Sequence, residues 1–436
     1  MPEILAPAPN GDRVNNNVNG DVSGKPGLAD LVNNNKSVNG NGVPKPQQGP
    51  HGPTAGGSDW IDAALVAEAL GEDPASVRDI VVKAAVADGD NYCSCMWRVR
   101  AVVGDRPVAL IVKAPPRGEL MQDFVSKLSF FSKEERMLTI PGVLIMEDLS
   151  VAGYRNKERQ GQLDQLHCET ALEILARLHA LSVALHREQP GCMDAYAETL
   201  FARRDDPEEE RHAKLHSEGQ LKKFGEMAGQ WEATAGTGLG EKMVKLSDGM
   251  HQRLCDIVAP GDESAGSLNV LNHGDFWINN MMFLYDEDDT QSRTPTDIRV
   301  VDLQIVRFSS PALDLQYFIV TSANQEVREG RLDELLEHYR RRFNEYAAAL
   351  GLEDVQWPTL DALRDEFLAK SLFGFSAIYT VLCAVVAAPE DKLQLEGVTK
   401  DNMMEADISS RAWRGSNFQR LLPGLLEYFD QVGVLE

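Results

Sequence analysis

The sequence lacks most of the marks of a secreted, zinc-binding or disulfide-stapled protein. Its six cysteines are scattered over 436 residues without a CxxC pair, which argues against a structural zinc site and a disulfide framework. The closest two, Cys93 and Cys95, would face one side of a strand and are interpreted as packing residues. The amino-terminal residues have neither the basic region nor the apolar run of a signal peptide. We therefore expect an intracellular protein in the reducing cytoplasm.

Basic residues are also scarce. Lys and Arg number 43 against 67 Asp and Glu, which leaves a net charge of −24. Such a chain repels nucleic-acid phosphates and acidic lipid surfaces, and no Lys/Arg-rich stripe offsets the repulsion. We expect neither nucleic acid nor a membrane among its partners. The hydrophobic fraction of 43% and the charged fraction of 25% are ordinary for a globular protein with a core.

Aromatic residues are absent from positions 1–57, which instead contain ten Asn, ten Gly and eight Pro. Such a segment cannot bury enough apolar surface to offset its conformational entropy, so we predict a disordered tail. Trp60 is the first aromatic residue and opens an amphipathic stretch that reaches Leu70. The folded region is therefore expected to begin near Ser58.

Charged residues are missing from one long stretch, 371–388, which just reaches transmembrane length. This stretch carries Ser, Gly, Thr and Cys throughout and lies far along the chain. Helices that are apolar on all sides also occur inside large cores. We therefore interpret 371–388 as a buried core helix in preference to a membrane span.

The remaining pattern predicts an α+β protein of two lobes. Four strand-like segments lie in the first part of the folded region: 79–86, 96–103, 108–112 and 143–146. A helical segment precedes the fourth strand, and from Leu163 onward apolar residues recur at helical spacing. We therefore expect a small β-rich lobe over 58–147 and a larger, mainly helical lobe over 148–436.

The segment 271–314 carries the polar residues that point to chemistry. It contains the pattern H-G-D-x-x-x-x-N, in which Asp275 and Asn280 stand five residues apart, and an apolar strand then leads to Asp302. Kinases are laid out in this way: one carboxylate accepts or orients the proton of an attacking hydroxyl, while an amide oxygen and a second carboxylate hold Mg²⁺. Asp275 is thus the predicted base, and Asn280 and Asp302, on the two arms of a hairpin, are the predicted metal ligands.

Other interpretations of these residues remain open. Each could be a turn or cap residue, although the three together between apolar strands favour function. His273, Asp275 and Asp302 could also be ligands of a metallohydrolase, which would need further His and carboxylate ligands. The acidic run 286–289 is interpreted as a solvated hairpin loop.

Two blocks of this region, HGDFWINN and VVDLQIVRFSSPALDLQYF, closely resemble the ecdysteroid kinase-like family. That family is related to choline kinases and aminoglycoside phosphotransferases, and the similarity extends over about residues 75–435. The resemblance implies a protein kinase-like bilobal fold with ATP and Mg²⁺ as cofactors. It also implies transfer of phosphate to a hydroxyl of a small molecule, with an ecdysteroid-type steroid as the family's own acceptor.

The resemblance assigns roles to further residues, and it makes Asp314 and His273 braces of the catalytic loop. Lys113 would contact the α and β phosphates and pair with Glu134, although an isolated Lys113 is typical of a solvated strand-end lysine. The other implied nucleotide-binding residues are Gly89, Asn91 and Ser94 in a phosphate loop, and Glu147 and Leu149 in the adenine-binding hinge.

The sequence departs from the family in one place. Only eleven residues separate Glu134 from Met146, where the family carries a longer segment with another strand. Loss of an edge strand would leave backbone groups unpaired and the nucleotide less covered. This shortened lobe raises a second hypothesis: a pseudokinase or small-ligand-binding protein that has lost productive ATP binding.

Overall fold

The computed structural model describes most of the chain beyond the predicted tail. The described residues are 58–86, 94–115, 143–196, 201–286, 294–357, 359–391 and 409–436. The predicted tail, 1–57, lies outside these residues, and so do Gly89, Asn91 and Glu134.

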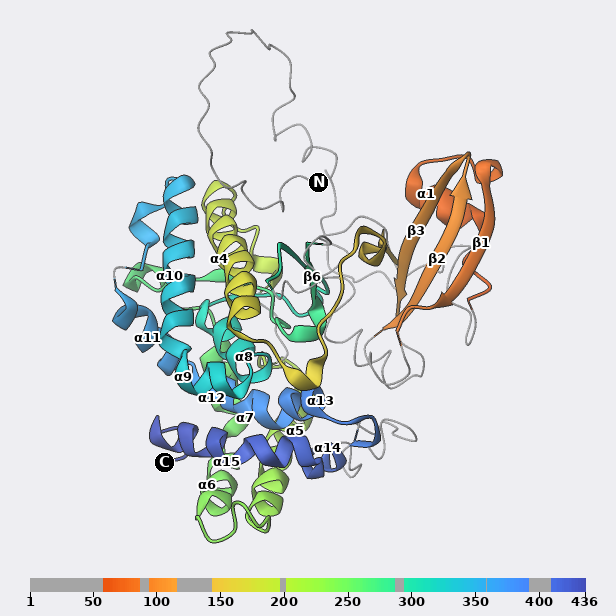
Figure 1. Ribbon diagram of the computed structural model, residues 1–436. Helices are drawn as coiled ribbons and strands as arrows, with labels where there is room; N and C mark the ends of the chain where they lie inside the picture. The colour runs from red at the N-terminus through yellow and green to blue at the C-terminus, as the bar shows by residue number, and fades with distance from the viewer. Residues whose placement is uncertain are drawn as a thin grey trace. The chain divides into compact units, whose positions relative to one another are not determined.

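The first lobe is built on a four-stranded antiparallel sheet in the order β1-β2-β3-β4 (Figure 1). Its strands, with the helix that precedes them, are α1 (Ala63–Leu70), β1 (Val77–Ala84), β2 (Cys95–Val103), β3 (Arg106–Ala114) and β4 (Leu144–Glu147). The strand predictions are confirmed, with shifts at their ends. The predicted Gly104 turn joins β2 to β3, since Val103 pairs with Arg106 and Gly104 has a φ of +60°.

The core of this lobe lies between α1 and one face of the sheet. Side chains of β2 alternate in burial, as a pleated strand with one covered face requires. Trp97 of β2 meets Trp60 edge-on, with ring centres 5.5 Å apart. The first aromatic residue of the chain therefore begins the folded region by packing on the sheet.

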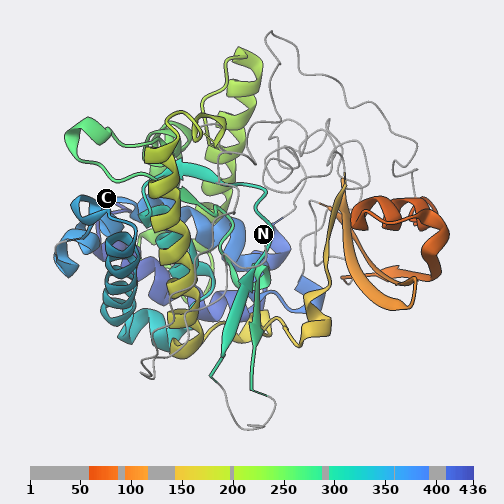
Figure 2. The same cartoon turned by 90° about the horizontal axis from the view of Figure 1, so that it is seen from above.

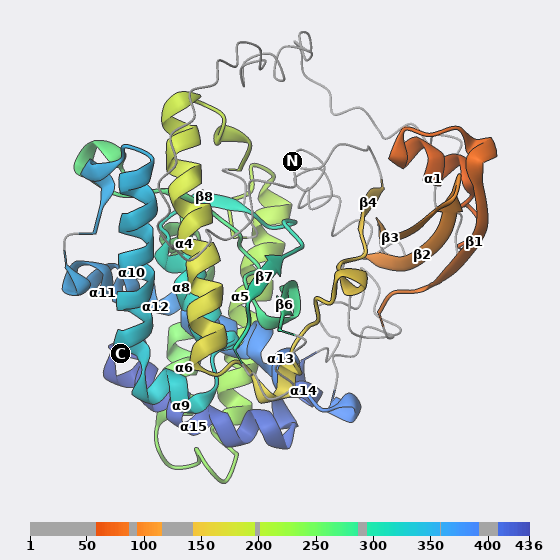
Figure 3. The same ribbon diagram turned by 45° about the horizontal axis from the view of Figure 1, so that its top comes forward.

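The second part of the chain is mainly helical (Figures 1 and 3). Its helices are α4 (Gln165–Glu188), α5 (Pro207–Ala228), α6 (Leu239–Ser247), α7 (Met250–Val258), α8 (Ala312–Thr321), α9 (Gln325–Gly330), α10 (Leu332–Ala349), α11 (Leu360–Ala369), α12 (Ser371–Ala377), α13 (Cys383–Val386), α14 (Ser410–Arg414) and α15 (Ser416–Gln431). The two long helices α4 and α10 pack side by side. An antiparallel sheet followed by a helical part confirms the α+β prediction.

Two short antiparallel strand pairs lie among these helices and frame the region that the sequence singled out. Strand β5 (Val270–Asn272) pairs with β8 (Arg307–Ser309), and β6 (Met281–Leu284) pairs with β7 (Asp297–Val300). Figure 2 shows β6 and β7 as two adjacent strands. Asn280 therefore enters one arm of a hairpin and Asp302 follows the other, as predicted.

The uncharged stretch 371–388 is helical and its side chains are largely buried. It is not one regular helix, because a π-helical turn (Ile378–Leu382) separates α12 from α13. Among the described residues no single helix is long and apolar enough to cross a membrane. One pair of helical segments, Leu360–Ala369 and Ser371–Val386, passes that test by length and composition but is bent by 57°.

Candidate active site

Asp275 lies in the loop between β5 and β6, and both oxygens of its carboxylate accept hydrogen bonds. Tyr317 of α8 donates its hydroxyl to Oδ1 at 2.6 Å, and Asn280 donates its Nδ2 to Oδ2 at 3.1 Å. Asn280 Nδ2 also lies 2.9 Å from the backbone oxygen of Asp275. The carboxylate is thus fixed in one orientation, and the donation through Nδ2 directs the Oδ1 of Asn280 to other partners.

Two effects raise the pKa of Asp275. Burial is the larger, and the nearby negative charge of Asp302 adds to it, while the bonds from Tyr317 and Asn280 oppose the change. The negative charge of Asp302 therefore acts on Asp275 and opposes its ionisation. Such a pair favours a cation between or beside its members.

The oxygen donors at this site fit Mg²⁺. Asn280 and Asp302 offer an amide and a carboxylate oxygen, which are the hard ligands that Mg²⁺ takes when phosphates and water complete its shell. Within the described part of the chain no group of three or more His, Cys, Asp and Glu side chains could hold a metal. The donor set therefore fits a metal that is bound together with a phosphate ligand.

Lys113 of β3 reaches the same site from the first lobe. Its Nζ lies 2.7 Å from Asp302 Oδ1, and its side chain is only 2% exposed. Lys113 is therefore not the solvated strand-end lysine that its local sequence suggests. Its pairing with Asp302 connects the predicted phosphate-binding lysine to the predicted metal ligand.

Asp302 itself has an unusual backbone. Its φ of +72° lies in the left-handed region, where side chains other than Gly are uncommon and Asp is among the better tolerated. Strained residues of this kind persist where the surrounding structure holds them, and they cluster at functional sites. The backbone of Asp302 is thus consistent with a carboxylate that is aimed by its loop.

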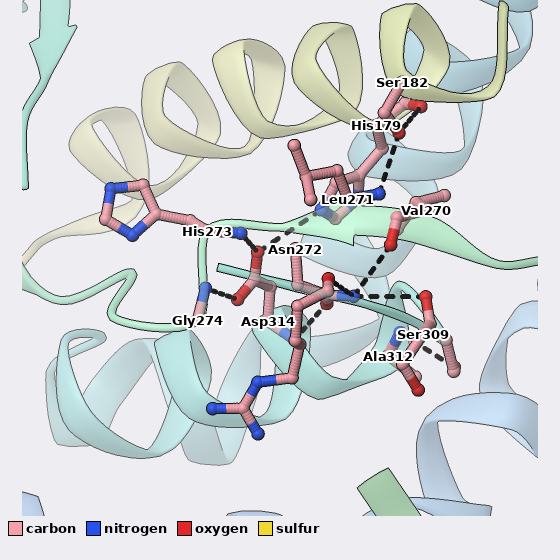
Figure 4. Close-up of polar contacts among 12 residues, drawn as sticks. His179, Ser182, Val270, Leu271, Asn272, His273, Gly274, Ser309, Ala312 and Asp314 are labelled. Atoms are coloured by element: carbon pink, nitrogen blue, oxygen red, sulfur yellow. Dashed lines mark hydrogen bonds and ion pairs between the residues drawn. The ribbon is translucent and has the colours of Figure 1, made fainter. Parts of the chain in front are cut away.

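Asp314 of α8 accepts hydrogen bonds from the loop that carries Asp275 (Figure 4). Its Oδ2 accepts the backbone N–H of His273 at 2.6 Å, and its Oδ1 accepts that of Gly274 at 2.9 Å. His179 Nε2 of α4 lies 3.3 Å from Oδ2, and Tyr339 Oη of α10 lies 2.8 Å from the other ring nitrogen of His179. Burial opposes ionisation, but these bonds hold the pKa of Asp314 below its usual value.

Gly274 is required by the close approach of two backbones. Its φ is +81°, and a Cβ at this position would lie 2.0 Å from the carbonyl oxygen of Ile305. The H-G-D motif therefore has a physical reason for its glycine. Asn272 directly precedes the H-G-D motif. Its side chain accepts a hydrogen bond from the backbone N–H of Asp314 and donates one to the carbonyl of Ser309, so it joins β5 to β8 and α8 (Figure 4).

The predicted hinge follows β4. Glu147 pairs with Leu110 of β3, and the N–H of the next residue, Asp148, donates to the Ala109 carbonyl at 3.1 Å. The Leu149 carbonyl accepts the N–H of Tyr154. Two of the backbone groups in the predicted adenine-binding segment are therefore already engaged within the protein.

The structure tests the other nucleotide-binding predictions only in part. Ser94 is buried just before β2. Gly89, Asn91 and Glu134 lie outside the described residues, so their roles stay predictions. Sequence reasoning gave no role to Tyr317 or Asn272, although the position of Tyr317 three residues after Asp314 on a helix is a signal that they share a face.

The α+β framework thus brings Asp275, Asn280 and Asp302 into one region, and comparison with known proteins identifies the family. The chain belongs to the ecdysteroid kinase-like family, whose model matches residues 88–141 and 138–352, more than half of the chain. The two matches meet between Glu134 and Met146, where the sequence is shorter than the family resemblance implies. No curated protein matches the chain.

Among solved structures, the chain is similar to the crystal structure of a thermostable mutant of aminoglycoside phosphotransferase APH(4)-Ia in a ternary complex with ADP and hygromycin B. The identity is 13%, the match covers 85% of this chain and 98% of that chain, and the TM-score is 0.29. At that TM-score the likeness supports no conclusion about this chain. Family membership supports a small-molecule kinase-like activity.

Proposed function

We propose that the protein transfers the γ-phosphate of ATP, with Mg²⁺, to a hydroxyl group of a small molecule. The observation that carries this proposal is the held carboxylate of Asp275, with Asn280 and Asp302 beside it. An ecdysteroid-type steroid is the acceptor to test first, because the family is named for that class.

In the proposed reaction the hydroxyl oxygen of the acceptor substrate bonds to the γ-phosphorus, and its proton moves to Asp275. The bond from the γ-phosphorus to ADP breaks, and ADP leaves. Tyr317 and Asn280 keep the carboxylate in place, which is the positioning that phosphoryl transfer chiefly requires. Asn280 and Asp302 would hold Mg²⁺, which when bound neutralises charge on the phosphate oxygens.

Lys113 would change partners when the nucleotide binds. Its ammonium contacts Asp302 Oδ1 in the structure. Contact with a phosphate would draw the ammonium away and leave that oxygen for the metal. The pair would thus keep the buried ammonium of Lys113 next to a carboxylate until the substrate arrives.

A second candidate function is a pseudokinase or small-ligand-binding protein. The observation that favours it is the short interval between Glu134 and Met146, where the family match is also divided. A protein of this kind would keep the helical part and its pocket-forming loops without productive binding of Mg·ATP.

The deciding experiment is a thermal-shift titration of the full-length protein with ATP, with and without Mg²⁺. Asp302→Asn tests the site, and Asp59→Asn is a matched control because Asp59 is exposed in the first lobe. A Mg²⁺-dependent rise in melting temperature that Asp302→Asn loses and Asp59→Asn keeps would support the kinase. A flat response from folded wild-type protein would favour the pseudokinase, and phosphate release from phosphomonoesters without ATP would favour a hydrolase.

A further inference from the structure

Arg307, the first residue of β8, carries a buried guanidinium group. It is 2% exposed. Its Nε and Nη1 are buried and receive no hydrogen-bond partner from the residues that the structure describes. Its guanidinium carbon lies 5.1 Å from the ring centre of Phe373 of α12, so one face of the group rests on an aromatic ring.

The charges around Arg307 belong to the catalytic region. Burial lowers its pKa, and the acidic groups that oppose this change are those of Asp314, Tyr317 and Asp275, in that order. Asp314 and Asp275 already accept hydrogen bonds from other residues at both of their oxygens. They therefore offset part of the charge of Arg307 but do not accept hydrogen bonds from its Nε and Nη1.

An arginine in this state is costly. A guanidinium offers five N–H donors in a fixed fork, and burying it without acceptors costs several kcal/mol by general experience with buried charges. Local violations of good packing and pairing are concentrated at functional sites. The unfilled N–H groups of Arg307 are thus best explained by an acceptor atom that a ligand supplies.

The surroundings of Arg307 define what that ligand looks like. Phe373 stacks on Tyr317 with ring centres 6.3 Å apart and an interplanar angle of 29°, and Phe201 meets Phe373 edge-on. Tyr317 in turn contacts Asp275. A buried cluster of aromatic rings therefore connects Arg307 to the proposed base.

We propose that Arg307 binds an oxygen atom of the acceptor substrate, next to the hydroxyl that Asp275 deprotonates. This inference rests on the proposed phosphotransferase function and narrows its acceptor. The acceptor has an apolar body that packs on Phe373 and carries a carbonyl or second hydroxyl oxygen near the reacting hydroxyl. A cationic amino alcohol is disfavoured, because its charge would meet that of Arg307 in a site of low dielectric.

Arg307 takes no part in the bond changes. The acceptor oxygen bonds to phosphorus, the bond from phosphorus to the leaving ADP oxygen breaks, and the proton moves to Asp275. Arg307 holds the second oxygen throughout, so it is a specificity-determining residue that sets which hydroxyl reaches the base.

The test compares the full-length wild-type protein with Arg307→Met and Arg307→Lys. Calorimetric titrations use ecdysone as the neutral probe and choline as the cationic probe, each with Mg²⁺ and a non-hydrolysable ATP analogue. Loss of charged hydrogen bonds should weaken ecdysone binding to Arg307→Met by about 10- to 100-fold, with a smaller loss in Arg307→Lys. Nucleotide binding should be the same in all three proteins.

A second measurement needs no ligand. Met fills a similar volume without a charge, and Asp314 keeps its own hydrogen bonds, so the melting temperature of ligand-free Arg307→Met should equal or exceed that of the wild type. A clear fall would show that the guanidinium has structural partners and would overturn the proposal. This readout holds even if Mg·ATP does not bind, in which case only the kinase function would have failed.

The remaining outcomes are also decisive. Wild-type protein that binds Mg·ATP but not ecdysone, or that binds choline as tightly as ecdysone, would contradict the acceptor assignment while the kinase function stands. Ecdysone binding that is unchanged in Arg307→Met would do the same.

Discussion

Asp275 lies in the loop between β5 and β6, and Asp314 of α8 accepts hydrogen bonds from that loop. Their surroundings move their pKa values in opposite directions. Asp275 faces the negative charge of Asp302 and has a raised pKa, whereas Asp314 receives backbone and histidine hydrogen bonds and has a lowered pKa. The carboxylate of Asp275 is held in place but its ionised form is disfavoured, whereas hydrogen bonds favour the ionised form of Asp314. This difference supports separate roles, that of proposed base for Asp275 and that of loop support for Asp314, and each role predicts its own effect of mutation.

The largest expected effect is on activity, from Asp275→Asn. A general base contributes about 10²- to 10⁴-fold to rate, so phosphate transfer should fall by that factor. The melting temperature should change little, because an amide oxygen can still accept from Tyr317. Transfer of labelled phosphate to ecdysone, with Asp59→Asn as control, checks this. A variant that retains near wild-type transfer would remove Asp275 from the role of base.

The supporting side should respond in stability. Asp314→Ala leaves the N–H groups of His273 and Gly274 without their acceptor inside the protein. The free energy of unfolding should fall by about 3 kcal/mol or more, since each buried unsatisfied donor costs about 1–3 kcal/mol. Urea denaturation measures the loss. Equal stability of Asp314→Ala and Asp275→Asn would erase the contrast between the two carboxylates.

A smaller effect is expected from glycine substitution within the loop. In Gly274→Ala the new Cβ would overlap the Ile305 carbonyl, and the residue would also need a positive φ. Gly104→Ala is a matched control, because Gly104 has a φ of +60° but no atom within 4 Å of its Cβ position. The control should lose about 1 kcal/mol of unfolding free energy, from conformation alone, and Gly274→Ala clearly more. Similar losses would indicate that the backbones are not in close contact.

The smallest effect is the pH dependence of stability, and its sign differs between the two carboxylates. The raised pKa of Asp275 means that its stabilising contribution is present below the usual carboxyl range and is lost as pH rises through the folded-state value. The lowered pKa of Asp314 means that its contribution is present above that range and is lost as pH falls.

Melting temperatures over a pH series should therefore show opposite slopes. Relative to wild type, Asp275→Asn should gain stability as pH rises above the ordinary carboxyl value. Asp314→Asn should lose least at the most acidic pH, where the wild-type bonds are themselves weakened. Parallel slopes for the two variants would mean that the two environments are alike.

Much of the fold could be predicted from the sequence. Apolar and polar alternation located β2, β-rich segments and short apolar runs located the other strands of the sheet, and the Gly104 turn located the hairpin of β2 and β3. The helical spacing after Leu163 corresponds to α4 and the helices beyond it. Element ends shifted because terminal residues are chosen by capping and pairing partners that periodicity does not reveal. The π-helical turn within 371–388 was also not foreseen, since its residues, IYTVL, include no Gly, Pro or charged residue that would mark a change in the helix.

The site was predictable where its residues share a motif. Asp275, Asn280 and Asp302 stand at a spacing that a hairpin brings together, and the structure places them so. The same reasoning could not place Lys113, which alone resembles a solvated residue, or show that Arg307 is buried without a partner. Both depend on what lies opposite them in space.

The sequence by itself determined the element types, the α+β class and the polar motif of the catalytic loop, because these depend on residues close together in the chain. Only the tertiary structure decided that Lys113 meets Asp302, 189 positions away, and that Tyr317 and Asn280 both donate hydrogen bonds to the carboxylate of Asp275. The physical reason is that charge, burial and hydrogen bonding act through space, and the distances that set them arise only when remote segments pack together.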